Sequence, residues 1–308
     1  MHTLLSKTIR HITSRYLQSV KSILTEDNHL LSPVFAFSAP FAVAQQPILG
    51  IINPGRTATL VLLLIIFILG YVFINQAQKG KKFPIRKIAG FEAIKEAVGR
   101  AVETGRPILY TFAYGNLYGG YAPQFMAALG ILSYVSKLAG QYDARVITTF
   151  GVPEAIPMVE EIMREGYRIG GRPDAYTQND VRYQTTEQFA YAAATQATII
   201  REKVATNIMI GPFAAEALIF AETGAAAGAI QIAGTARETE IPFFVLVCDY
   251  VLIAEEMFAA AALATGDEST AAVLGAEDVG KFISIALILL GIGLLTLLKV
   301  NLGALLSI

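Results

Sequence analysis

The chain has few of the residues on which most catalytic and metal sites depend. It contains one cysteine, Cys248, and three histidines, His2, His11 and His29, among 308 residues. A single cysteine excludes an internal disulfide framework and a cysteine-rich zinc site. Because no histidine follows position 29, a Ser-His-Asp or Cys-His arrangement cannot be assembled within the rest of the chain.

Charged residues are also scarce. They make up 16% of the chain, whereas about 25% is usual in a soluble domain. Apolar residues reach 54%, and the mean hydropathy is +0.51. This composition predicts membrane segments.

Two apolar stretches have the length of a membrane-spanning helix. Residues 57–78 carry no charge between Arg56 and Lys79, and such a length crosses about 30 Å of hydrocarbon at about 1.5 Å per residue. A second apolar stretch begins after Lys281 and resumes beyond Lys299. We therefore predict transmembrane helices at residues 57–78 and 280–308.

Basic residues predict the orientation of these spans. Five of them follow the first span closely: Lys79, Lys81, Lys82, Arg86 and Lys87. The positive-inside rule keeps such a flank in the cytoplasm, although lysines also solvate linkers. We expect a multi-pass protein of the cell membrane, with a basic juxtamembrane linker at residues 79–90 and a cytoplasmic main domain at residues 91–279.

Residues 1–56 allow two interpretations. The first part has the pattern of a basic amphipathic helix at a membrane surface, with Leu5, Ile9 and Ile12 on one face. The apolar stretch that ends in Ala-Val-Ala predicts signal-peptidase cleavage after Ala44. Prolines inside this stretch oppose cleavage and favour a retained segment.

The main domain is acidic. Residues 91–278 hold 23 Asp and Glu against 12 Lys and Arg, a net charge of 12 − 23 = −11. Nucleic acid phosphates would be repelled, so we expect no nucleic-acid partner.

Strand-like and helix-like segments alternate through this domain. Expected strands are "PILYTFAY", "RVITTFG", "NIMIG", "GAIQIAG" and "PFFVLVCDY", with helical patterns between them. Such alternation predicts an α/β fold with a doubly wound, mostly parallel, Rossmann-like sheet. The near-continuous apolar character of "PFFVLVC" suggests a central buried strand.

Ligands of such sheets bind beyond the carboxyl ends of the strands. Reading those ends and the helices that follow gives six candidate ligand-binding residues: Glu216, Glu222, Gln231, Thr235, Asp249 and Glu255. Polar residues and glycines at strand ends also make turns and cap helices without any ligand. No EF-hand spacing is present, and we expect no metal.

The stretch "TFAYGNLYGGYAPQF", residues 111–125, follows the first strand. It fits neither G-x-G-x-x-G nor the P-loop pattern, and no basic residue follows before Lys137. We therefore expect no strong triphosphate site there, and we expect its tyrosines to contact protein. Cys248 beside Asp249 suggests a nucleophile, but a cysteine in an apolar segment is more often inert.

Several segments resemble a known family. "GRPDAY", "VRYQTTEQFAYAAA", "IIREKVATNIMIGPFAAEALIFAETGAAAGAIQIAGT" and "PFFVLVCDYVLIAEEMFAAAAL" are similar to an uncharacterised family of prokaryotic membrane proteins, a domain of unknown function. The resemblance runs from about Gly90 to the second span and is strongest from Gly171 onward. It implies a membrane setting and an α/β domain, but no reaction and no cofactor.

Two functions follow from this interpretation. The first is a membrane-anchored homo-oligomeric scaffold, because two membrane anchors, alanine-rich helices and a tyrosine-rich loop favour subunit contacts. Its expected partners are the lipid bilayer and further copies of the chain. The alternative is a small-ligand-binding or enzymatic domain, with its site at the six candidate residues.

Overall fold

The computed structural model describes residues 57–112 and 117–298 of the chain. The predicted cleavage after Ala44, the amphipathic segment and Tyr114 of the first loop lie outside these residues. Residues 63–290 form one unit, which contains the whole α/β part of the chain.

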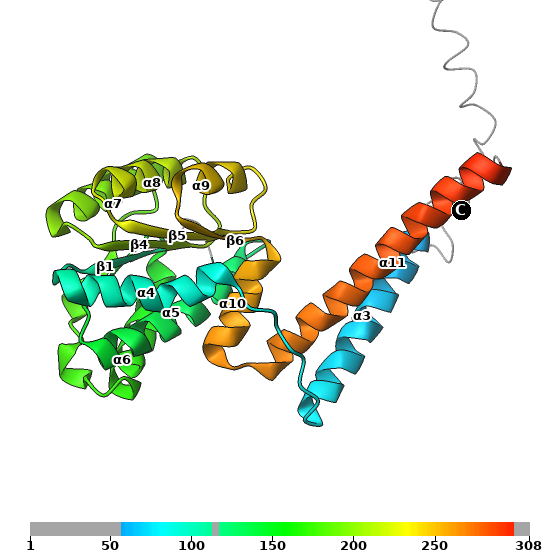
Figure 1. The fold of residues 1–308 in the computed structure, drawn as a ribbon, viewed down its shortest axis with the longest axis horizontal. Helices are drawn as coiled ribbons and strands as arrows, with labels where there is room; N and C mark the ends of the chain where they lie inside the picture. Colours follow the sequence, from blue (N-terminus) through cyan, green and yellow to red (C-terminus); the bar gives the residue numbers. More distant parts are fainter. Residues whose placement is uncertain (1–56, 113–116, 299–308) are drawn as a thin grey trace, which may run out of the picture. The chain divides into compact units, whose positions relative to one another are not determined.

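A single sheet of six parallel strands forms the centre of the unit (Figure 1). Its order is β3-β2-β1-β4-β5-β6, so the predicted parallel α/β sheet is confirmed. The strands are β1 (Ile108–Thr111), β2 (Val146–Phe150), β3 (Val181–Tyr183), β4 (Thr206–Ile210), β5 (Ile230–Thr235) and β6 (Tyr250–Ile253).

Helices cover both faces of this sheet (Figure 1). One layer contains α4 (Ala89–Thr104), α5 (Ala122–Tyr142), α6 (Ile156–Ile169) and α10 (Glu255–Thr265). The other contains α7 (Gln188–Glu202), α8 (Glu216–Ala226) and α9 (Ile241–Val247). The chain changes face between β3 and β4, which makes the sheet doubly wound.

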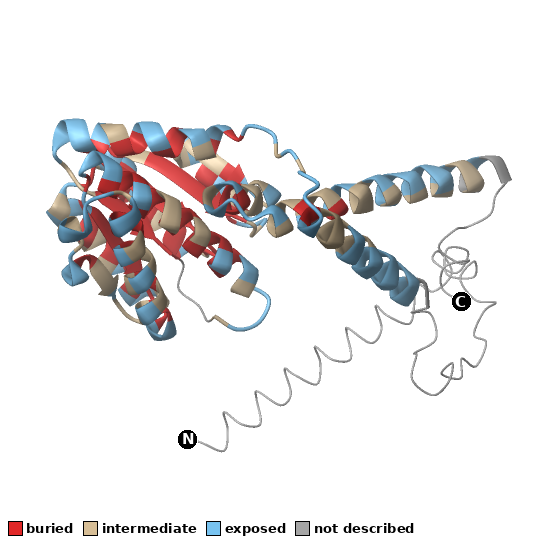
Figure 2. Cartoon of the chain, turned by 90° about the horizontal axis from the view of Figure 1, so that it is seen from below, coloured by how far each residue is buried: buried red, intermediate tan, exposed pale blue. Residues whose placement is uncertain are grey.

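Successive side chains of β1 point into the two halves of the core. Ile108 and Tyr110 pack among α4 and α5, while Leu109 packs with α7 and α8 residues. All four residues of β1 are buried. Buried residues gather along the sheet and on the helix faces that cover it (Figure 2). Both faces of the strand are covered, which explains its uninterrupted apolar run.

A glycine ends the first helix of the α/β domain. Gly105 adopts the left-handed conformation, with φ of 63°, directly after α4. Its N–H donates to the carbonyl of Val102 at 3.1 Å. Glycine takes this conformation without the steric cost that a Cβ would add.

The prediction of one strand over "PFFVLVCDY" was wrong. Residues 241–247 form the short helix α9, and β6 begins only at Tyr250. Pro242 lies in the first turn of α9, where its missing N–H costs no hydrogen bond and its fixed φ suits a helix. An apolar run without clear alternation does not distinguish a strand from a buried helix segment.

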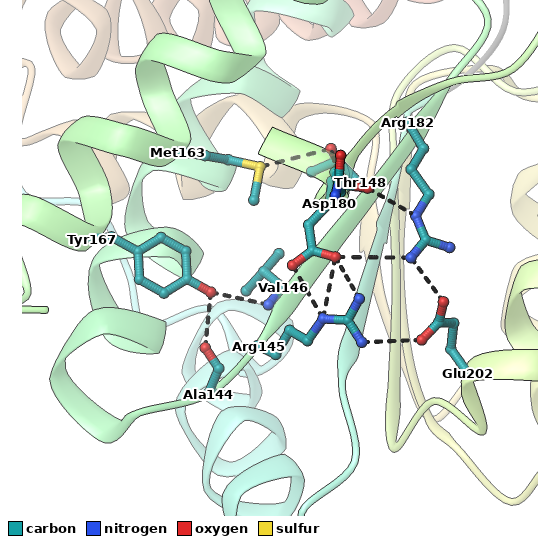
Figure 3. A network of polar contacts seen from close by, with 10 residues as sticks. Ala144, Arg145, Val146, Thr148, Met163, Tyr167, Asp180, Arg182 and Glu202 are labelled. Carbon is teal, nitrogen blue, oxygen red and sulfur yellow. Dashed lines mark hydrogen bonds and ion pairs between the residues drawn. The ribbon is translucent and has the colours of Figure 1, made fainter. Parts of the chain in front are cut away.

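The five expected strands did not include β3, which lies in a polar segment of the sequence. Asp180, just before β3, accepts hydrogen bonds from Nε and Nη2 of the Arg145 guanidinium, the shortest being 2.6 Å from Nη2 (Figure 3). Arg182 within β3 donates to Glu202 at the end of α7, at 2.7 Å. This network fixes an edge strand of only three residues.

Two long helices flank the α/β part of the chain. α3 (Thr57–Gln78) occupies the residues predicted for the first span, and α11 (Glu268–Leu298) runs without a break through the predicted boundary at 279/280. Within the described residues, Thr59–Gln78 alone has the length and hydropathy needed to cross a membrane. The predicted pair of membrane spans is therefore not confirmed.

Candidate functional site

The strand order defines where a ligand crevice would lie. β1 and β4 are neighbours in the sheet, but the helices that follow them, α5 and α8, cover opposite faces. The connections therefore diverge at the carboxyl ends of these two strands. Open parallel sheets bind their ligands at such a switch point.

The turn from β4 into α8 lies at this edge of the sheet. Gly211 has φ of 145°, which only glycine adopts without strain, and its N–H donates to the carbonyl of Gly234 at 2.9 Å. Glu216, the first residue of α8, is fully buried. Its carboxylate accepts hydrogen bonds from the side chain of Gln188 at 2.5 Å and from the N–H of Ala214 at 2.9 Å.

The carboxylate of Glu216 thus lies at the amino end of α8. A carboxylate at this position stabilises the helix dipole and satisfies a backbone donor. The same position is where a bound phosphate would otherwise find its donors. Phosphate binding at α8 is therefore disfavoured.

The first turn of α5 lies at the same edge of the sheet. Gln124 is buried, and its side-chain oxygen accepts a hydrogen bond from the N–H of Ala236, just after β5. The guanidinium of Arg237 lies over the ring of Tyr121, 5.2 Å from its centroid. These two contacts join the β1–α5 and β5–α9 connections across the crevice.

The amino end of α5 offers few free donors. Pro123 has no N–H, and the N–H groups of Ala122 and Gln124 already donate to the carbonyls of Gly119 and Tyr121. Arg237 pairs with no carboxylate among residues 57–112 and 117–298. Its guanidinium is therefore a charged donor at this edge of the sheet, suited to a planar anionic group.

Buried hydroxyls support the crevice from behind. Tyr191 of α7 donates its hydroxyl to the carbonyl of Phe112, at the end of β1, and to that of Thr149 at 3.1 Å. Thr111 and Thr149 bring their hydroxyls within 3.3 Å of each other. Burial raises the pKa of Tyr191 far above its usual value, so this hydroxyl remains a donor at any physiological pH.

The structure divides the six predicted site residues between the two ends of the sheet. Thr235 ends β5, Glu216 begins α8 and Glu255 begins α10, so these three belong to the carboxyl side. Glu222, Gln231 and Asp249 lie toward the other side. Asp249 was expected after the last strand, but it directly precedes β6, because α9 occupies the residues assigned to that strand.

Gln231 and Asp249 have structural partners. The N–H of Gln231 donates to the carboxylate of Asp249 at 2.8 Å, and its side-chain oxygen accepts from the amide of Asn207 at 3.2 Å. Cys248 ends α9, and burial, followed by the charge of Asp249, raises the pKa of its thiol to about 12. Such a thiol is a poor nucleophile, as the sequence led us to expect.

Sequence reasoning missed Arg237 and Gln124. Arg237 lies two residues beyond the end of β5, outside the strand ends that gave the candidates. The sequence has no basic residue between Tyr121 and Lys137, so it predicted no cation near the first loop. Only the fold brings Arg237 to Tyr121. Candidate residues taken up to two positions beyond each strand end would have included Arg237.

Comparisons with known proteins give a family but no activity. A family model described as "Domain of unknown function (DUF6754)" matches residues 48–305. Searches of curated proteins and of solved structures found no match. Among the described residues, no group of three or more His, Cys, Asp or Glu side chains is arranged to hold a metal ion.

Proposed function

The chain belongs to this family of unknown function, DUF6754, and we propose that its membrane-anchored α/β domain binds a small anionic molecule in the crevice between β1 and β4. The observation that carries the proposal is Arg237 over Tyr121 at the switch point. A carboxylate or a single phosphate group suits one guanidinium. A triphosphate would need further donors, which the ends of α5 and α8 do not provide.

Binding is favoured over catalysis in this proposal. The chain has no histidine beyond His29, and the buried carboxylate of Glu216 is already occupied by Gln188 and Ala214. The crevice therefore supplies recognition groups rather than an acid–base pair. The flat ring of Tyr121 and the planar guanidinium of Arg237 favour a ligand with a planar group.

A thermal-shift screen of the full chain in mild detergent tests the proposal. The probes are inorganic phosphate, small carboxylates and nucleoside monophosphates. We expect one class to raise the melting temperature, and Arg237→Gln to weaken its binding roughly tenfold, as expected when a hydrogen bond to a charged group is lost.

Arg164→Gln is the matched control. Arg164 also lies over a tyrosine, Tyr176, at 5.7 Å, but on α6 and away from the crevice. Its substitution should leave the ligand response unchanged. An equal response of the wild type and Arg237→Gln would refute the assignment of the site.

The membrane anchor rests on α3, whose Thr59–Gln78 segment has a mean hydropathy of 2.5. We propose that it crosses the membrane and that α11 enters the membrane as a second span. The basic residues after α3 favour a cytoplasmic α/β domain. Length and composition support this arrangement, as does the resemblance of the sequence to membrane proteins.

A homo-oligomeric scaffold is the second candidate, and α9 favours it. Three of its seven residues are large exposed apolar side chains: Phe243, Val245 and Leu246, the last 83% exposed. An uncharged apolar helix face of this kind is typical of a protein contact. We expect the wild type to form an oligomer in mild detergent and Leu246→Glu to dissociate it. Ile169→Glu, the same kind of change at an exposed residue of α6, should leave the oligomer intact. A monomeric wild type would eliminate this candidate.

A further inference from the structure

A second cavity lies away from the crevice, where the linker after α3 meets α10 and α11. Its volume is about 470 Å³, within the usual range for small-ligand sites. Apolar side chains form part of its lining: Phe83, Ile85, Ala259 and Leu274. Charged side chains from three segments complete it.

These charges are of both signs. Arg86 of the linker pairs with Glu256 at 2.6 Å. Lys281 of α11 pairs with Glu255 and, at 3.2 Å, with Asp278. Two cations and three carboxylates line the cavity, a net charge of 2 − 3 = −1. Their side chains retain access to solvent, from 24% exposed for Glu256 to 73% for Arg86.

An apolar groove lies next to this cavity, between α3 and α11. Its volume is about 920 Å³, and Ile66, Phe67, Ile74 and Ile285 contribute to its walls. Gly70 and Gly280 also line the groove, and no atom lies within 4 Å of where a Cβ would stand on either. The floor of the groove is therefore open.

Lys281 lines both spaces. Its side chain therefore stands between the cavity and the groove, and its apolar stem and charged tip suit such a boundary. A molecule that occupied both would need a charged head and an apolar tail. The groove belongs to the helices that we propose to lie in the membrane, where such molecules are abundant.

We propose that the cavity and the groove together bind one phospholipid with a primary-ammonium zwitterionic headgroup. Arg86 and Lys281 suit the phosphate, while Glu255 and Asp278 suit the ammonium, which donates three hydrogen bonds. The excess of carboxylates disfavours a purely anionic lipid. An acyl chain fills the groove between α3 and α11. This inference rests on the membrane anchoring in the proposed function, but not on the crevice.

The full chain in alkyl maltoside micelles allows a direct test by native mass spectrometry. The probes are the dioctanoyl forms of phosphatidylethanolamine, phosphatidylcholine and phosphatidylglycerol. We expect phosphatidylethanolamine to bind at least tenfold more tightly than the other two. Choline cannot donate hydrogen bonds to the carboxylates, and phosphatidylglycerol carries no cation for them.

Variants locate the site. Lys281→Met and Glu255→Gln should each weaken phosphatidylethanolamine binding about tenfold, whereas Lys95→Met and Glu103→Gln, exposed changes of the same kind on α4, should have no effect. Should Lys281→Met fail to fold, as judged by its melting temperature in lipid-free micelles, Asp278→Asn takes its place with the same expected loss.

Three results would overturn the inference: equal binding of all three lipids, tighter binding of phosphatidylglycerol, or wild-type binding by the cavity variants. Failure of the proposed function would be detected by two other measurements. Loss of anchoring would release the chain from membranes under alkaline carbonate, and loss of crevice binding would be measured with Arg237→Gln, which leaves the lipid site intact.

Discussion

At the scale of single residues, one glycine determines how closely α8 packs against the sheet. Gly224 lies within α8, directly against the buried amides of Gln231 and Asn207. A Cβ at this glycine would stand 2.4 Å from the side-chain oxygen of Gln231 and 2.9 Å from the amide nitrogen of Asn207. Neither neighbour is free to move, because their amides bond to each other. The glycine is therefore required by its surroundings.

We predict that Gly224→Ala destabilises the protein by about 1–3 kcal/mol through overpacking, despite the better helix propensity of alanine. Gly99→Ala in α4 is the matched control, because no atom lies within 4 Å of its Cβ position. That change should stabilise the protein by up to about 1 kcal/mol. Urea unfolding of both variants measures the difference, and a Gly224→Ala midpoint at or above that of the wild type would contradict the prediction.

Some residues could be assigned from the sequence, because their roles depend on near neighbours. Gly105 follows a helical pattern directly, and its left-handed φ was predictable from that position alone. Cys248 was expected to be inert from its apolar surroundings, and burial raises the pKa of its thiol accordingly. Arg237 was not predictable in this way, since its role depends on Tyr121 in a distant loop.

At the scale of elements, the alternation of strands and helices predicted most of the sheet. The two errors, α9 and β3, share a cause. Neither segment has a periodic pattern: α9 is apolar on its buried and exposed sides, and β3 has three residues, none of them buried. Tertiary contacts determine such segments. For β3 these contacts come from Arg145, Asp180 and Glu202.

The ionic network around β3 predicts a dependence of stability on pH. The hydrogen bond from Arg182 lowers the pKa of Glu202 in the folded protein. A carboxyl group whose pKa is lower in the folded than in the unfolded protein stabilises the folded state at pH values above the unfolded-state pKa. This stabilisation is lost as the pH falls through the pKa of the folded state. We expect the free energy of unfolding to decrease below about pH 5, with Glu202 contributing about 0.5–1 kcal/mol after allowance for solvent screening.

Glu202→Gln should remove that part of the decrease, so the variant and the wild type should converge at low pH. Glu161→Gln is the control, because Glu161 pairs with Arg164 on the exposed surface of α6. Urea unfolding between pH 3 and pH 7 measures both. Parallel curves for the wild type and Glu202→Gln would exclude a role of this carboxylate in the pH dependence.

At the scale of the whole molecule, α3 carries the prediction that the protein is anchored in a membrane. Phe67 lies near the middle of α3, and its side chain is 74% exposed. A charge at such a position costs about 2.5–3.5 kcal/mol on insertion scales. We therefore expect Phe67→Arg to reduce insertion of segment 57–78 roughly a hundredfold in a reporter fusion, while Phe67→Leu inserts like the wild type.

Alkaline carbonate extraction of the full chain supplies the independent measurement. The wild type should stay with the membrane fraction. Complete release of the full chain would mean that the exposed apolar side chains of α3 cover a protein partner instead of lipid.

The sequence by itself determined the properties that depend on local pattern. Hydropathy marked α3, periodicity marked the central strands and most helices, and composition excluded imidazole chemistry after His29 and a cysteine-based zinc site. These features arise from residues within a turn or two of each other, so they can be read along the chain.

Only the tertiary structure decided the order of the strands, and with it the site. The order β3-β2-β1-β4-β5-β6 places the switch point between β1 and β4. This order depends on which face of the sheet each connecting helix covers, and that is decided by tertiary packing. The same packing brought Arg237 to Tyr121 and placed Asp249 before β6. The contact of Arg237 with Tyr121 joins segments far apart in the sequence, and no local pattern encodes their proximity.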